Sequence, residues 1–136
     1  GEAHREMAKA MGAAWVGEDP AEMPVRTDSA ILFAPAGELV PPALRALKKG
    51  GTLALAGIHM SDVPGLPYEE CLFHEKNVRS VTANTRADGF GLLREAAAIP
   101  IRPKVTAFPL SDANRALQLL KADRISGSGV LIVAAG

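Results

Sequence analysis

The sequence has one cysteine, few aromatic residues, no net charge and no long apolar run. Cys71 stands alone among 136 residues, which excludes an internal disulfide framework and any zinc site built from several cysteines. The 15 Lys and Arg residues balance the 15 Asp and Glu residues, so the charge gives no reason to expect a nucleic-acid partner. No apolar stretch approaches the roughly 18 residues of a membrane span. The first residues also lack the charged head and apolar core of a signal peptide, so we expect a cytoplasmic protein without a membrane partner.

The rest of the composition is that of an ordinary folded domain. The hydrophobic fraction of 48% and the charged fraction of 22% are close to the globular average, which excludes disorder as the default. The length fits one compact unit that buries roughly 68% of its unfolded surface. There are 24 alanines against six aromatic residues. Close packing of helices on a sheet explains this excess, and a genomic codon bias explains it equally well.

Short apolar runs alternate with segments of helical spacing along the chain. The predicted strands are Ser29–Ala34, Thr52–Ala56, Val78–Ala83, Val105–Phe108 and Val130–Val133, with a short edge strand and a loop between Trp15 and Asp28. The predicted helices are Ala3–Met11, a stripe from Val40 to Leu47 that Gly50 and Gly51 end, a short Tyr68–His74, a segment capped by Asn84 or Thr85 that runs to Ala98, and one capped by Ser111.

This alternation predicts a doubly wound, mostly parallel sheet with helices on both faces. The continuous run Ser29–Ala34 is typical of a strand that is buried on both faces. Ligands of such sheets bind outside the carboxyl ends of the strands, near the point where the strand order reverses. Three segments therefore form the candidate crevice, namely 34–37, 57–60 and 83–85.

The residues by themselves supply no catalytic apparatus. Gly127 and Gly129 are not followed by a helix, so they do not form a phosphate loop. The three histidines lack metal-ligand spacing, and we interpret them as surface or loop residues. Glu69 and Glu70 would point about 100° apart on a helix and cannot flank one substrate bond. Cys71 has no neighbouring base, and we interpret it as a buried, inert thiol.

Several segments resemble medium-chain, zinc-dependent alcohol dehydrogenases, and the tail is similar to their bacterial members. The segment Glu6–Ala13 resembles a helix of these enzymes that ends in A-x-x-x-G-A, and Leu44–Leu53 resembles their A-L-x-x-L-x-x-G-G-x-L segment. The tail is the most specific part, and it comprises Ser80–Asp88, Ile101–Pro103 and Phe108–Leu117.

The resemblance implies that the chain is the C-terminal portion of a longer enzyme. The fold is then an incomplete Rossmann-type nucleotide-binding domain in residues 1–100, with residues 101–136 returning to the catalytic domain. The parent enzyme would transfer a hydride between an alcohol or aldehyde and NAD or NADP, with a catalytic zinc. The zinc ligands would lie upstream, so no residue of this chain is assigned to a metal. We expect the isolated chain to be inactive and to bind NAD(P) weakly, because it lacks the phosphate-binding helix N-terminus.

The resemblance also implies a set of cofactor-binding positions. They are His4 or Arg5 beside the adenosine ribose, Ala34, Pro35 and Ala36 on the adenosine side, Gly57, Ile58 and His59 at the nicotinamide end, and Ala83 and Asn84 beside the nicotinamide amide. For Arg5, a solvated residue of the helix is the reading that we favour over a cofactor contact. An arginine that the family often has before the last strand is Ser128 here.

The same resemblance implies a homodimer through the edge strand Val78–Ala83, which would pair with its twin. Two other readings stay open. One is a non-catalytic α/β nucleotide-binding or dimerisation module of dehydrogenase ancestry. The other is a methyltransferase fragment, which only the turn at Gly50 and Gly51 supports.

Overall fold

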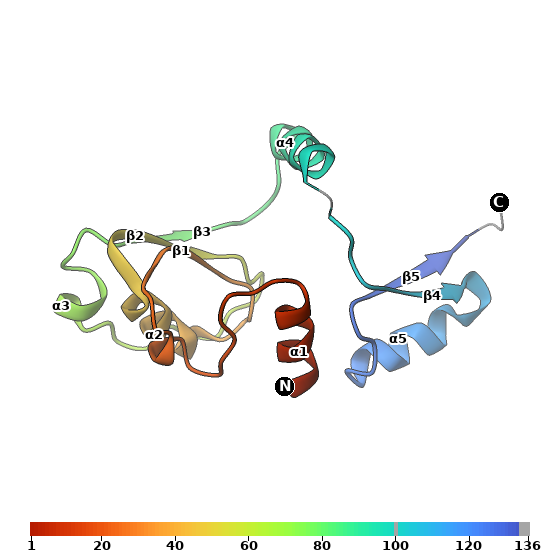
Figure 1. The fold of residues 1–136 in the computed structure, drawn as a ribbon, viewed down its shortest axis with the longest axis horizontal. Helices are drawn as coiled ribbons and strands as arrows, with labels where there is room; N and C mark the ends of the chain where they lie inside the picture. The colour runs from red at the N-terminus through yellow and green to blue at the C-terminus, as the bar shows by residue number, and fades with distance from the viewer. Residues whose placement is uncertain (100, 134–136) are drawn as a thin grey trace. The chain divides into compact units, whose positions relative to one another are not determined.

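The computed structural model describes residues 1–99 and 101–133, which form two compact units. The first to be described contains residues 11–84. The other contains residues 1–10 together with the described residues from 85 onward. Figure 1 shows the path of the chain through both units.

Residues 11–84 are built around a three-stranded parallel sheet. The strands β1 (Thr27–Leu32), β2 (Leu47–Leu55) and β3 (Asn77–Ser80) follow one another in the order β1-β2-β3. The helix α2 (Val40–Arg45) connects β1 to β2 and packs against both strands (Figure 1). The predicted α/β fold with parallel strands is confirmed. The three strands run in sequence order, so the order does not reverse among them.

The core of this unit lies between α2 and one face of the sheet. Leu44 of α2 and Leu53 of β2 are fully buried, and Cys71 is buried beside them. The predicted burial of Cys71 is therefore confirmed. The prediction that the Ser29–Ala34 strand is buried on both faces is wrong for β1, because Ile31 is 62% exposed. Successive side chains of a strand point to opposite faces, and α2 covers the face that carries Leu32.

The helix α2 ends earlier than its apolar stripe predicts. It stops at Arg45, and β2 already begins at Leu47 and runs through Gly50 and Gly51. The helix ends early because Leu47 pairs with Thr27 of β1. The Thr27 N–H also donates to the carbonyl of Ala46. Burial of Leu47, which is 1% exposed, is achieved in the strand instead of the helix.

The connections of this unit contain short helical turns. They are the 3₁₀ turns η1 (Pro20–Glu22) and η2 (Gly37–Leu39) and the one-turn helix α3 (Tyr68–Cys71). The short edge strand predicted between Trp15 and Asp28 is wrong, because this stretch contains η1. Asp19 caps η1 by accepting the Ala21 N–H at 2.8 Å, and proline in its first turn suits a helical start.

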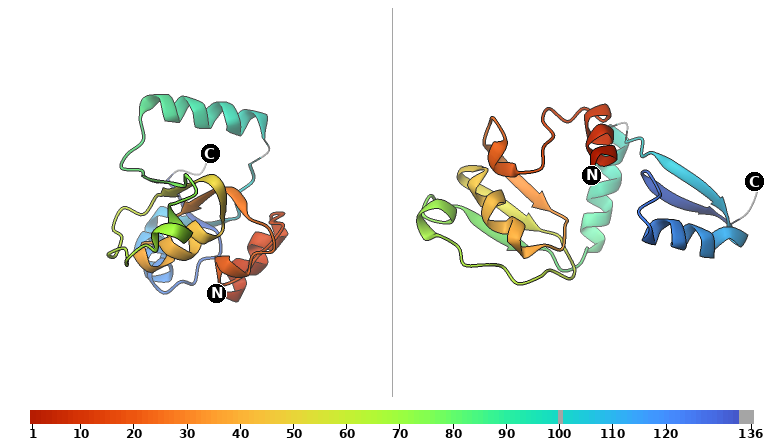
Figure 2. Two further views of the ribbon diagram at one scale, coloured as in Figure 1. Left: turned by 90° about the vertical axis from the view of Figure 1, so that its left-hand side faces the viewer. Right: turned by 90° about the horizontal axis from the view of Figure 1, so that it is seen from below.

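The other unit combines helices with a two-stranded parallel sheet. It contains α1 (Glu2–Ala10), α4 (Arg86–Ala98), β4 (Val105–Pro109), η3 (Leu110–Asp112), α5 (Ala113–Lys121) and β5 (Ser128–Ile132). β4 pairs with β5, and α5 connects them and packs against both strands (Figure 2). None of the helices that the structure describes is long and apolar enough to cross a membrane.

The starts of α4 and α5 test two predicted caps. Thr85 is the N-cap of α4, where it accepts the Asp88 N–H at 3.2 Å while the Asp88 carboxylate accepts the Thr85 N–H at 2.7 Å. This reciprocal capping box confirms one of the two predicted caps. The predicted cap Ser111 is wrong, because η3 precedes α5 and the N-cap position is Asp112.

Candidate functional site

The three segments of the predicted crevice leave the three-stranded sheet side by side. The Ala56 N–H donates to the carbonyl of Leu32 at 2.9 Å, and the Val81 N–H donates to the carbonyl of Leu55 at 2.9 Å. Each bond joins the first residue beyond one strand to the last residue of its neighbour. The carboxyl ends of β1, β2 and β3 therefore lie at one edge of the sheet, as their parallel pairing requires.

Gly57 brings the segment after β2 against the segment after β1. A Cβ atom built on Gly57 would lie 3.4 Å from Cα of Pro35 and 3.6 Å from the carbonyl oxygen of Ala34. It would also lie 3.4 Å from Cε of Met60. A larger side chain at this position would thus meet the wall that the predicted adenosine-side residues form. The absence of a side chain lets the segment after β2 approach the segment after β1 at this distance.

A polar contact ties the loop after Gly57 to the start of η2. The Gly37 N–H donates to Oγ of Ser61 at 2.8 Å, and the Ser61 hydroxyl donates to Oε2 of Glu38 at 3.2 Å. The Ser61 N–H also donates to the carbonyl of Pro35 at 3.3 Å. Gly37 is buried, and a Cβ there would collide with the carbonyl oxygens of Ser61 and Asp62. Sequence reasoning missed Ser61, because nothing local marks a serine in a proline-rich loop as a partner of Gly37.

The predicted positions differ in exposure and in the unit to which they belong. Ile58 is 87% exposed, and His59, Ala83 and Asn84 are exposed as well. The structure brings Ala34, Pro35 and Gly57 close together at one sheet edge. Ala83 and Asn84 follow β3 further along the chain, beyond the bond from Val81 to Leu55.

The other two predicted positions, His4 and Arg5, lie on α1 and belong to the other unit. Nε2 of His4 lies 3.9 Å from Oδ1 of Asp123 in that unit, and both side chains are exposed.

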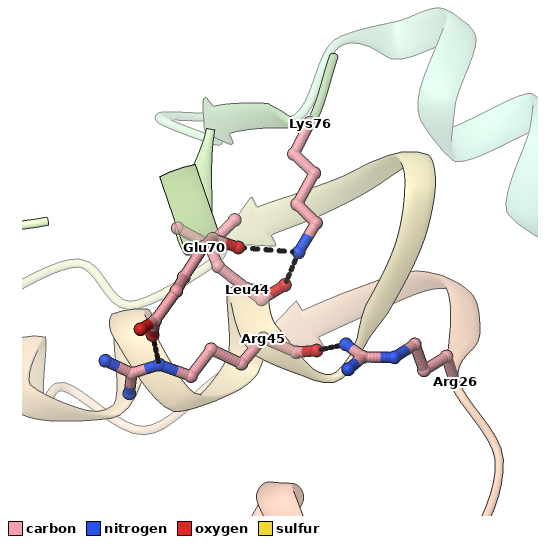
Figure 3. A network of polar contacts seen from close by, with 5 residues as sticks. All are labelled: Arg26, Leu44, Arg45, Glu70 and Lys76. Atoms are coloured by element: carbon pink, nitrogen blue, oxygen red, sulfur yellow. Dashed lines mark hydrogen bonds and ion pairs between the residues drawn. The ribbon is translucent and has the colours of Figure 1, made fainter. Parts of the chain in front are cut away.

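A second polar cluster surrounds the C-terminal end of α2 (Figure 3). Lys76 Nζ donates to the carbonyls of Leu44 at 2.7 Å and of Glu70 at 2.9 Å, and Arg26 donates to the carbonyl of Arg45. Nε of Arg45 lies 2.6 Å from Oε2 of Glu70. These cations occupy the carbonyl end of a helix, where positive charge is favourable.

The charges of this cluster perturb one another. The hydrogen bond to Glu70 raises the pKa of Arg45 above its ordinary value. Burial lowers the pKa of Lys76, and the nearby charge of Arg26 lowers it further. The cluster therefore holds several cations close together at some electrostatic cost. No three His, Cys, Asp or Glu side chains gather into a metal site within residues 1–99 and 101–133.

No family model matches the chain. The family is indicated instead by comparison with one known protein. Over 129 residues it is 48% identical to the "Probable alcohol dehydrogenase AdhA" of Mycobacterium tuberculosis (strain CDC 1551 / Oshkosh), a match that covers 95% of this chain. The chain belongs with the alcohol dehydrogenases. It corresponds to a C-terminal portion of such a protein and spans 37% of the length of this relative.

Solved structures of alcohol dehydrogenases share the fold of this portion. A crystal structure of an NAD-dependent alcohol dehydrogenase superposes with a TM-score of 0.74 at 23% identity, over 98% of this chain and 42% of that chain. The Helicobacter pylori CAD in complex with NADP(H) superposes with a TM-score of 0.70 at 19% identity, over 96% of this chain and 38% of that chain. These likenesses establish a Rossmann-type fragment and no more than the fold.

Proposed function

We propose that this portion of an alcohol dehydrogenase forms one side of the crevice that holds a nicotinamide cofactor. The parent enzyme would transfer a hydride between an alcohol or aldehyde and NAD or NADP. The observation that carries the proposal is that three parallel strands end at one edge of the sheet, where Gly57 approaches Pro35 closely. Ligands of parallel α/β sheets bind at this edge.

The residues at this edge fit a flat cofactor ring and its ribose. Ala34, Pro35 and Ala36 offer a small apolar wall, and Gly57 and Ile58 offer backbone groups at a place where a Cβ would reduce the space. Asn84 is exposed and carries an amide that can donate and accept hydrogen bonds. When bound, the cofactor supplies the hydride chemistry. The chain's own residues would position it and exclude water from one side.

The proposed zinc of the parent does not fit the residues described here. No metal-binding group of three side chains occurs in the part of the chain that the structure describes. We propose that the remainder of the enzyme holds the metal, and we derive no step through it from this chain. The assignment of residues 1–100 to the nucleotide-binding domain and of 101–136 to a returning segment is part of the same proposal, as is a cytoplasmic location.

A pair of glycine substitutions in the whole enzyme tests the proposed crevice. Gly57→Val places a branched side chain against Pro35, so we expect the KM for NAD(P) to rise about tenfold, a loss of roughly 1.4 kcal/mol in binding. Gly65→Val is the matched control, because nothing lies within 4 Å of a Cβ there. Initial rates of NAD(P)H formation with a series of alcohols give the KM values, and thermal unfolding separates misfolding from lost affinity.

The outcome also separates the two functional readings. Equal KM values for both glycine variants would contradict the proposed crevice. Cofactor binding without alcohol oxidation in the whole protein would favour the non-catalytic binding module. For the 136-residue chain alone, we expect calorimetry to give no micromolar affinity for either nucleotide.

We further propose that the chain forms a homodimer through β3 and the residues after it, up to Ala83. β3 is an edge strand, and Val78 and Val81 next to this edge are 38% and 47% exposed. An unpaired edge is a template for another strand. The Val81 N–H is bonded to β2, so the Ser80 N–H, one residue earlier, faces away from the sheet.

Ser80→Pro therefore removes a donor of the outer edge and leaves the bonds to β2 in place. We expect the wild-type mass by light scattering to be twice the mass of one chain and that of Ser80→Pro to equal one chain. Ser80→Ala is the control and should stay dimeric. A monomeric wild-type protein would refute the interface.

A further inference from the structure

A cavity of about 640 Å³ lies at the amino ends of the three parallel strands. Its lining includes Arg26 just before β1, Arg45 at the end of α2, Lys49 of β2 and Lys76 just before β3. Glu69, Glu70 and His74 complete its polar lining. The volume falls in the range of small-molecule sites. The cavity lies at the sheet edge opposite to the proposed cofactor crevice, so the two sites are distinct.

The charges around this cavity do not cancel. Four cations face two carboxylates, and Glu70 is already engaged by Arg45 at 2.6 Å. The four cations therefore exceed the two carboxylates by two positive charges. A dianion is the ligand that balances this excess. Cations gathered in a concave surface attract anions, because the low-dielectric walls focus their field.

Two of the cations are held in place by the backbone and retain donors for a ligand. Arg26 uses part of its guanidinium on the carbonyl of Arg45, and Lys76 uses two of its three N–H donors on the carbonyls of Leu44 and Glu70 (Figure 3). Donors that are positioned before binding lose less side-chain entropy when a ligand arrives. Lys49, which is exposed, adds a third positive charge to the same cavity.

We propose that this cavity binds a small phosphate monoester through Arg26, Lys49 and Lys76. The phosphate group is a dianion with three acceptor oxygens, which matches the charge excess and the donors of the three side chains. The remaining volume accommodates the organic part of the ester beside Leu47. The proposal does not depend on hydride transfer, because the site shares no residue with the proposed crevice.

Neighbouring lysines on β2 provide a matched test. Lys49 lines the cavity, whereas Lys48 pairs with Asp28 at 2.9 Å and is not among the lining residues. Lys49→Gln and Lys48→Gln remove the same charge at adjacent positions. The whole enzyme, without nicotinamide cofactor, is titrated calorimetrically with glycerol 3-phosphate, with inorganic phosphate and with glycerol at about pH 8, where the phosphates are dianions.

We expect glycerol 3-phosphate to bind, glycerol not to bind, and Lys49→Gln to weaken the affinity about tenfold, the usual worth of a charge-assisted hydrogen bond. Lys48→Gln should change it less than about twofold. Inorganic phosphate that binds as tightly as the ester would show that the phosphate group supplies the whole affinity, which supports the site. Absence of binding at about 10 mM ester, or equal weakening by both variants, would overturn the proposal.

Discussion

Replacement of Gly37 by alanine should destabilise the protein at the edge of the proposed crevice. A Cβ on Gly37 would collide with the carbonyl oxygens of Ser61 and Asp62, which are backbone atoms that cannot rotate away. The loop that contains Ser61 must then move. Its movement would also break the 2.8 Å bond from the Gly37 N–H to the Ser61 hydroxyl.

The magnitude follows from these two losses. Overpacking in a closely packed region costs about 1–3 kcal/mol, and a hydrogen bond contributes about 1 kcal/mol. The lower entropy of the unfolded alanine chain returns about 0.4–1 kcal/mol. We therefore expect Gly37→Ala to lower the free energy of unfolding by about 1–3.5 kcal/mol, which corresponds to a fall of roughly 5–15 °C in Tm for a chain of this size.

The assay is urea and thermal unfolding, followed by circular dichroism, of Gly37→Ala beside Gly65→Ala. A Cβ on Gly65 meets nothing within 4 Å, so the control should match the wild type or exceed it slightly. The two alanine variants have the same composition, so the difference between them isolates the contact with Ser61 and Asp62. A difference below about 0.5 kcal/mol would refute the reasoning that this glycine is required by close approach of the loop.

Two further predictions concern the core and the cap of α4. Leu44→Ala should lower the free energy of unfolding in denaturant titrations by about 2–5 kcal/mol, because Leu44 is fully buried. The control Leu117→Ala, at a site that is 63% exposed, should change this free energy by less than about 1 kcal/mol. Hydrogen bonds from Thr85 lower the pKa of Asp88 below its ordinary value of 3.8. The capping box therefore stabilises α4 fully above pH 3.8. This contribution is lost as the pH falls through the lower pKa that Asp88 has in the folded state. Protection of the α4 amides from hydrogen exchange should fall below about pH 4 in the wild type and should not fall in Asp88→Asn. Wild-type protection that does not change with pH below about 4 would contradict this stabilisation by Asp88.

The elements that sequence reasoning predicted correctly depend on neighbours in the chain. Thr85 and Asp88 are three residues apart and form the capping box without help from the rest of the fold. The strand Val105–Phe108 is signalled by its own apolar run and is found as β4, which ends one residue later. The rule that parallel strands end together also predicts that residues 34–36 and 57–59 share one edge, and Gly57 does approach Pro35 there. The role of these residues in holding a cofactor stays a prediction.

The failures lie where distant residues compete with local preference. Leu47 continues the helical stripe of α2, yet pairing with Thr27 draws it into β2. The stretch before Asp28 has the composition of a strand and loop, but proline and the Asp19 cap produce η1. Ser111 has the side chain of a cap, and the 3₁₀ turn η3 moves the start of α5 beyond it.

The sequence by itself determined the class of the fold, the carboxyl edge of the sheet and the family resemblance, because periodicity, turns and motifs are local properties. Only the tertiary structure decided where α2 ends and which cations gather there. Arg26, Arg45 and Lys76 are far apart in the chain, and they meet because parallel strands bring their amino ends to one edge. The contact between Gly37 and Ser61 arises in the same way at the opposite edge.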